Sequence, residues 1–177
     1  MLSATPSHSL ALLLLAAFPA GVIVAALKDA TSFTIPNWVS IGLALAFVPA
    51  ALAVHLPAGG WGMSLAAAFA ALLAGIGMFA MGWCGGGDAK LMAASALWLG
   101  WPGVLPFLAV TGLAGGALAL ALITARKGWL SVYAASGPVW AQRLLTEGED
   151  LPYGLAIAVG ALAAFPSSAL IAAMTGS

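Results

Sequence analysis

The stretch MGWCGGGDAKLM, residues 81–92, interrupts a chain that is otherwise almost continuously apolar. It places an aspartate and a lysine directly beside three consecutive glycines. A glycine inside a helix costs roughly 1 kcal/mol relative to alanine, and a charge at the centre of a bilayer costs roughly 3 kcal/mol or more. The stretch therefore predicts a break between two membrane-spanning segments, at a place where a function offsets these costs.

The overall composition indicates an integral membrane protein. The chain has 177 residues, of which 63% are hydrophobic and 6% are charged, whereas about a quarter of the residues in a soluble domain are charged. Five basic and five acidic residues balance, so no charge excess points to nucleic acid. The single cysteine, Cys84, excludes an internal disulfide and a multi-cysteine zinc site, and we expect no metal and no cofactor.

Apolar segments of about 20 residues are needed to cross the hydrocarbon core. We expect spans at residues 9–27, 37–56, 61–82, 104–125 and 152–174, with a shorter one at 89–101. The first lacks a basic residue before it and is followed by Lys28, so we expect a retained helix rather than a cleaved signal peptide. The predicted fold is all-α: a single domain over residues 1–177 that forms a bundle of six transmembrane helices with short loops.

The distribution of charge predicts which side of the membrane each loop faces. With six crossings every basic loop lies on one side, and the loops around 57–60 and 102–103 carry no basic residue. This positive-inside pattern predicts a cytoplasmic location for the basic loops and a periplasmic location for both termini. Five tryptophans fall at the ends of apolar segments and are predicted to be interfacial: Trp38, Trp61, Trp83, Trp98 and Trp101.

The longest polar interval, residues 126–151, has a mixed first half that is typical of an interfacial segment. Its second half contains three acidic residues, Glu147, Glu149 and Asp150. Two interpretations are open for them: a solvated acidic turn, or a docking surface for a basic peptide.

The other two carboxylates of the chain are Asp29 and Asp88, and the topology predicts that both lie at the cytoplasmic boundary of the bilayer. Two carboxylates in proximity share a proton, so one can act as acid and the other as base. Such a pair activates water against a peptide carbonyl and protonates the leaving amine. Simpler roles are also open, because Asp29 can pair with Lys28 and Asp88 can cap a helix.

Other chemistries have weaker support in the sequence. His8 and His55 are predicted on the opposite side from the two aspartates, so Cys84 has no imidazole base there. The same two histidines have no acidic partner for a metal. A serine–lysine dyad would need Ser32 or Ser131, and neither lies in a recognisable motif.

Three motifs in the same order resemble those of the type IV prepilin peptidases, a family of membrane-embedded aspartic proteases. GGGDAKLM resembles the GxGD motif of the family, and Asp29 followed by IPNW at residues 35–38 resembles its first catalytic segment. PYGLAIAVG at residues 152–160 resembles the signature at the start of its last span. The presenilin type of GxGD protease also has YD and PAL motifs, which this chain lacks.

The resemblance implies a role for each matching residue. Asp29 and Asp88 would be catalytic, and Gly85 and Gly87 would fill the glycine positions of the motif. Gly86 would occupy the variable position between them. The resemblance also implies a set of residues that shape the site or bind substrate: Lys90, Pro36, Asn37, Pro152, Tyr153 and Gly154.

The chain lacks the cytoplasmic domain with four zinc-binding cysteines that the larger, methylating members of the family carry between their first two spans. It therefore resembles the shorter members that serve Flp (tight-adherence) pili. The implied function is removal of the leader from a prepilin at the cytoplasmic face of the bacterial inner membrane. The implied partners are the precursor, the lipid bilayer and other pilus assembly proteins. Two alternatives stay open: a small proton-coupled transporter subunit, and a pilus or secretion assembly factor without catalysis.

Overall fold

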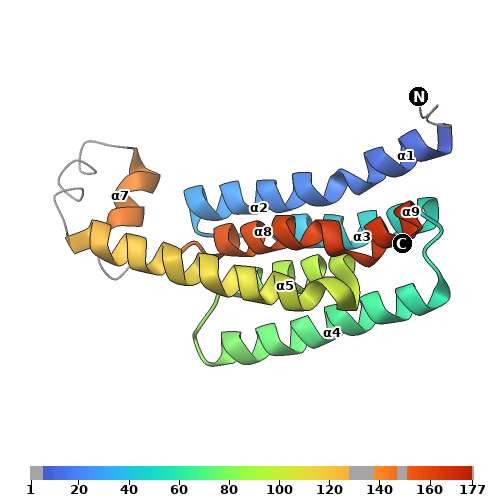
Figure 1. The fold of residues 1–177 in the computed structure, drawn as a ribbon. Coiled ribbons are helices and arrows are strands. Elements are labelled where there is room, and N and C mark those ends of the chain that lie inside the picture. Colours follow the sequence, from blue (N-terminus) through green and yellow to red (C-terminus); the bar gives the residue numbers. More distant parts are fainter. Residues whose placement is uncertain (1–5, 128–137, 147–150, 177) are drawn as a thin grey trace.

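The computed structural model describes residues 6–127, 138–146 and 151–176, and nearly all of them are helical (Figure 1). This confirms the predicted all-α class. The elements are α1 (Pro6–Leu15), α2 (Ala17–Ser32), α3 (Asn37–Ala53), α4 (Ala58–Ala80), α5 (Gly86–Lys127), α7 (Val139–Leu145), α8 (Tyr153–Ala164), the 3₁₀ turn η1 (Phe165–Ser167) and α9 (Ala169–Thr175).

Within the described residues, four helical segments are long and apolar enough to cross a membrane: His8–Ser32, Ala58–Ala80, Gly86–Arg126 and Tyr153–Thr175. The helix α3 is apolar but shorter. The protein is therefore a helical membrane protein, and the number of six crossings stays a prediction.

A turn inside α5 reconciles this helix with the two separate segments that the sequence predicts. Gly100 has φ 64° and ψ 178°, a left-handed φ that a residue without a Cβ adopts without strain. The chain reverses direction here, so the two halves of α5 form an antiparallel hairpin (Figure 1). A Cβ at Gly100 would lie 3.0 Å from Cβ of Ala169 and 3.2 Å from Oγ of Ser64, so glycine is also required by the close packing.

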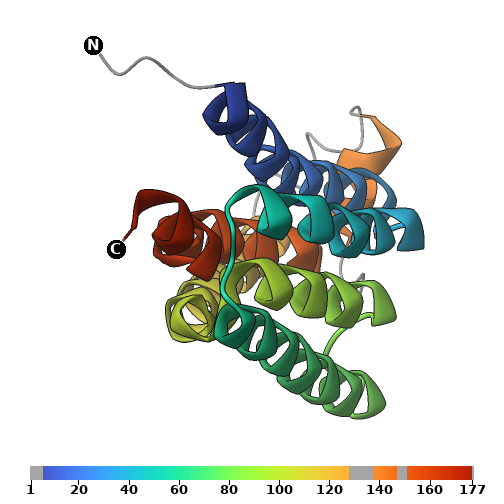
Figure 2. The same ribbon diagram turned by 90° about the vertical axis from the view of Figure 1, so that its right-hand side faces the viewer.

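The end view in Figure 2 shows the C-terminal helices between the N-terminal helices and α5. The helix α8 packs against α2 on one side and against α5 on the other. It thereby brings the start of the last segment next to the end of the first. This packing positions the candidate site.

Trp98 lies in the core of the bundle, and its predicted interfacial location is wrong. The ring is 0% exposed, stacks on Phe18 at 5.3 Å between centroids, and donates a 2.8 Å hydrogen bond from Nε1 to the carbonyl oxygen of Leu43. The physical reason is that the first half of α5 is short and surrounded by other helices, so a residue near its end faces the interior. Trp38, Trp83 and Trp101 are exposed and Trp61 is half-buried, and their location at the membrane interface stays a prediction.

The two ends of the bundle differ in their polar residues. The end of α2, the turn at residues 81–85, α7 and the start of α8 gather at one end (Figure 1). His8 and His55 line a cavity at the opposite end, where α1 begins and α9 ends. The segments that carry the two aspartates thus lie at one end of the bundle and the two histidines at the other, as the sequence predicts. Which end faces the cytoplasm stays a prediction.

Candidate active site

Asp29 lies one turn before the end of α2, with its side chain turned into the bundle and 6% exposed. The helix ends because Phe33 adopts a left-handed conformation with φ 53°, and its N–H donates a 2.8 Å hydrogen bond to the carbonyl oxygen of Asp29. A left-handed conformation is uncommon for a bulky residue. This conformation places Phe33 on the same cavity wall as the Asp29 carboxylate.

The start of α8 provides the hydrogen bond that holds the Asp29 side chain. The backbone N–H of Gly154 donates to Oδ2 of Asp29 at 2.7 Å. Gly154 lies in the first turn of α8, after Pro152, and N–H groups of a first turn have no partner inside their own helix. The partial positive charge at this helix terminus stabilises a carboxylate. The third motif of the sequence therefore meets the first motif in space.

Asp88 lies in the first turn of α5 and is 7% exposed. Its Oδ2 accepts a 2.9 Å hydrogen bond from the backbone N–H of Gly85, three residues earlier. This is the arrangement in which an acidic side chain at the third helical position reaches back to the capping residue. Asp88 thus caps its helix, and the same bond orients its carboxylate.

One cavity of about 190 Å³ connects the two aspartates. Its lining residues come from α2, the 81–85 turn and the start of α8: Asp29, Phe33, Gly82, Trp83, Cys84, Gly85, Asp88, Leu151 and Tyr153. A cavity of this size with polar walls has room for water molecules. The structure therefore brings both carboxyl groups to one cavity that has room for water.

The three motif glycines differ in their surroundings. A Cβ at Gly87 would lie 3.0 Å from Cβ and 3.3 Å from the carbonyl oxygen of Ile35, and a Cβ at Gly85 would lie 3.2 Å from Oδ2 of Asp88. A Cβ at Gly86 would meet only the Phe79 ring, at 3.7 Å. Two of the three positions thus need glycine for close packing, and the middle one has room for a side chain.

Lys90 and Asn37 contact each other and do not line the aspartate cavity. The Lys90 Nζ donates a 2.8 Å hydrogen bond to Oδ1 of Asn37, which ties the start of α5 to the start of α3. Pro36 is the N-cap of α3, and the helix begins at Asn37, as the sequence predicts. That Lys90, Pro36 and Asn37 shape the site or bind substrate stays a prediction.

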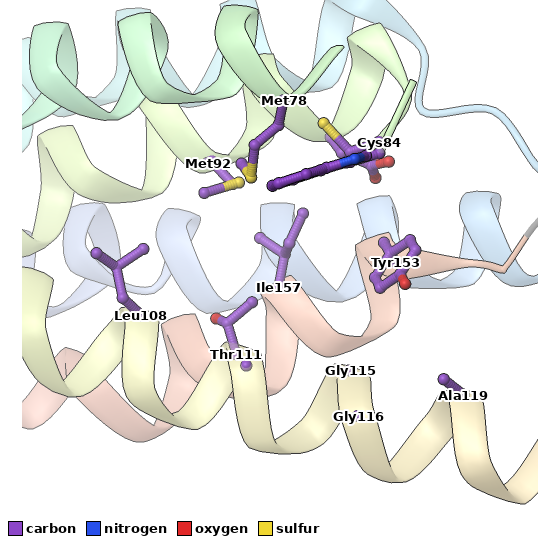
Figure 3. Close-up of a pocket in the computed structure, with 13 residues that line it drawn as sticks. Met78, Cys84, Met92, Leu108, Thr111, Gly115, Gly116, Ala119, Tyr153 and Ile157 are labelled. Atoms are coloured by element: carbon purple, nitrogen blue, oxygen red, sulfur yellow. The ribbon is translucent and has the colours of Figure 1, made fainter. Parts of the chain in front are cut away.

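A larger, mostly apolar groove of about 490 Å³ opens from the aspartate cavity (Figure 3). One wall comes from the end of α4, the 81–85 turn and the first half of α5, and the other from the second half of α5 and the start of α8. It shares four lining residues with that cavity: Trp83, Cys84, Asp88 and Tyr153. Figure 3 shows Met78 and Met92 on one side of the groove, and Gly115 and Gly116 on the other. We call this the glycine-lined groove.

Several lining residues were not identified from the sequence. Phe33 and Leu151 line the aspartate cavity, and Thr111 lines the glycine-lined groove. The Thr111 hydroxyl is buried without a hydrogen-bond partner in the structure. Trp83 and Cys84 immediately precede the glycines, and this position in the sequence is the signal that could have identified them.

Cys84 lies in the turn between α4 and α5, at the edge of both cavities. Burial raises the pKa of its thiol above the usual value, and the negative charge of Asp88 raises it further. The thiolate is the nucleophilic form of cysteine. This environment therefore keeps the thiol protonated, which does not favour a role for Cys84 as a nucleophile.

The helix α7 packs on the outer side of the aspartate cavity. The Arg143 guanidinium lies 4.9 Å from the centre of the Phe33 ring, and Nε of Arg126 donates a 3.0 Å hydrogen bond to the carbonyl oxygen of Leu144. The predicted acidic cluster of Glu147, Glu149 and Asp150 lies outside the described residues. In the described part of the chain, no group of three or more His, Cys, Asp or Glu side chains gathers where a metal could bind.

The fold and the shared cavity define a helical membrane protein with two carboxylates at one internal site. A model of the type IV leader peptidase family matches residues 16–120, which include both aspartates, and the chain belongs to this family. Comparisons with curated proteins and with solved structures returned no match.

Proposed function

We propose that this protein removes the leader peptide from Flp-type prepilins at the cytoplasmic face of the inner membrane, with Asp29 and Asp88 as the catalytic pair. The observation that carries the proposal is that both carboxylates line one cavity at one end of the bundle. Membership in the type IV leader peptidase family supports it independently.

The proposed chemistry needs one ionised and one protonated carboxyl group. The ionised carboxylate takes a proton from a water molecule in the cavity as that water attacks the scissile carbonyl. The protonated carboxyl then donates its proton to the leaving amine. The hydrogen bonds from Gly154 and Gly85 hold the two side chains in place, which reduces the reorganisation needed during the reaction.

The glycine-lined groove is the proposed binding site for the apolar helix of the precursor. Gly112 and Gly116 have no atom within 4 Å of an added Cβ, and small residues of this kind let two helices approach closely in a membrane. Met78 and Met92 provide adaptable contact surfaces. A helix in this groove would direct the leader toward Asp88 and the aspartate cavity.

The assignment to Flp-type precursors rests on the short link between α2 and α3. Only residues 33–36 separate the two helices, so the zinc-binding domain of the larger family members has no place there.

The positions of the acids also favour peptidase chemistry over a proton relay. Asp29 lies in the last turns of α2 and Asp88 in the first turn of α5, whereas a transmembrane relay needs acids along the helices.

The test is cleavage of a co-expressed Flp-type precursor by Asp29→Asn and Asp88→Asn variants. We expect each variant to lose at least about a hundredfold in cleavage rate, the contribution of a general acid or base. Size-exclusion chromatography and circular dichroism on both variants establish that the bundle is still folded. Near-normal cleavage by either folded variant would refute the catalytic pair and leave the transporter or assembly-factor alternatives.

A further inference from the structure

Lys90 lines a second groove, which neither aspartate lines. This groove, of about 520 Å³, lies between α3, α4 and the first half of α5, and Lys90 is its charged residue. The remaining lining is apolar apart from Ser40, with Ile41, Leu65 and Phe69 each more than half exposed. We call it the Lys90 groove.

We propose that the Lys90 groove binds one anionic glycerophospholipid, with the phosphate at Lys90 and an acyl chain along α3 and α4. This site is independent of the proposed peptidase activity.

The outer end of the groove suits a phosphate. Lys90 donates one hydrogen bond to Oδ1 of Asn37, and an ammonium group has two further donors. Asn37 carries no charge, so this bond leaves the positive charge of Lys90 in place. The N-terminus of α3 begins at the same residue and adds a partial positive charge. Basic pockets between transmembrane helices are typical binding sites for anionic headgroups.

One turn further along α3, Ser40 provides a second polar group. Its side chain is 7% exposed, and its hydroxyl is buried without a hydrogen-bond partner in the structure. Leaving a buried hydroxyl unpaired is costly. Ser40 lies about 4.5 Å along the helix axis from Asn37, and the ester carbonyls of a phospholipid lie just below its phosphate. Ser40 lines the groove, and because its hydroxyl has no partner to give up, rotation about its Cα–Cβ bond turns it toward an ester oxygen of a bound lipid.

The rest of the groove suits an acyl chain. Beyond Ser40 its walls are alanine, leucine, isoleucine and phenylalanine side chains on the apolar helices α3, α4 and α5. A second protein helix fits the groove less well than a lipid. The carbonyls of such a helix are already bonded within the helix, so only an acidic side chain could pair with Lys90, whereas every anionic phospholipid carries a phosphate.

The experiment is native mass spectrometry of the full-length protein in detergent, titrated with phosphatidylglycerol or with phosphatidylcholine of the same acyl chains. We expect the wild type to prefer phosphatidylglycerol by about fivefold, the effect of one lysine near an anionic headgroup. Lys90→Gln should abolish the preference, because it keeps a hydrogen bond donor but removes the charge. Lys28→Gln is the matched control: this lysine is exposed on α2 and does not line the groove.

Two further variants test the deeper part of the groove. Ser40→Ala should weaken the binding of both lipids, and Ala44→Phe should fill the groove and exclude both. Ala74→Phe, at an exposed position on α4 outside the groove, is the control for Ala44→Phe. Equal binding of the two lipids by the wild type, or an unchanged preference in folded Lys90→Gln, would overturn the proposal. So would capture of a second copy of the chain, instead of lipid, by a photo-crosslinker at Ile41.

Discussion

The backbone N–H of Gly154 donates a 2.7 Å hydrogen bond to Oδ2 of Asp29, a residue that lies 125 positions earlier in the chain. This bond joins the first and last segments of the bundle at the cavity that also contains Asp88. It gives the glycine a positioning role for the carboxylate.

Gly154→Ala should lower the cleavage rate by about a hundredfold, the effect expected for a misplacement of a catalytic group by about 1 Å. An added Cβ would lie 2.9 Å from both Cβ and Oδ2 of Asp29, so the carboxylate must move. The measurement is the initial rate of precursor cleavage. Gly77→Ala is the control because its Cβ would meet nothing within 4 Å. Equal rates for the Gly154 and Gly77 variants would contradict the positioning role.

Gly86→Ala and Gly87→Ala should differ although the two residues are adjacent. The Gly87 variant should lose activity and thermal stability, because its Cβ would press on the backbone of Ile35. The Gly86 variant should keep both, because its Cβ makes ordinary contact with the Phe79 ring. Cleavage assays and melting curves measured side by side test this contrast. If Gly86→Ala is the more damaged variant, the packing described for the GGGD turn is wrong.

The reactivity of Cys84 should report on the charge of Asp88. The charge raises the pKa of the thiol, so Asp88→Asn should lower that pKa and shift the alkylation profile toward lower pH. At a fixed pH of about 8, near the usual thiol pKa, the variant should therefore react faster than the wild type. Asp29→Asn is the control, because the upward shift of the thiol pKa arises from burial and from Asp88. An identical profile in the wild type and Asp88→Asn would contradict the prediction.

Gly112→Trp should block the glycine-lined groove and weaken the binding of precursors. An indole at this open position fills the space assigned to the substrate helix, so we expect KM for the full precursor to rise about tenfold or more, by the loss of roughly 1.4 kcal/mol of binding. Cleavage of a short soluble peptide that spans the cleavage site should be unchanged. Leu113→Trp, an exposed neighbour outside the groove, serves as control. Equal losses with both substrates would argue against a separate helix site.

Much of the fold could be predicted because the relevant signals are local. The apolar segments and the glycine and proline residues near position 100 predict where helices begin and end, and Gly100 turns the chain where the prediction separates two segments. The alternation of basic and uncharged loops then places both aspartates at one end. These signals depend only on residue type and spacing.

The features that could not be predicted depend on which way a side chain faces. Trp98 carries the same sequence signal as Trp101, yet one is buried in the core and the other is exposed. Lys90 follows Asp88 by two residues on the same helix, yet the two line different cavities. Neighbouring helices decide these orientations, and their packing is not encoded in any short motif.

Both acids are anchored by main-chain amides, Gly154 for Asp29 and Gly85 for Asp88. An alanine scan, which shortens one side chain at a time, would not remove either of these backbone donors. Its largest effects would come from bulky neighbouring side chains, and the orientation of the two carboxylates would be assigned to those side chains instead. Substitutions at the two glycines themselves are therefore needed to detect the role of these amides. Alanine adds a methyl group beside the carboxylate, and proline removes the N–H donor.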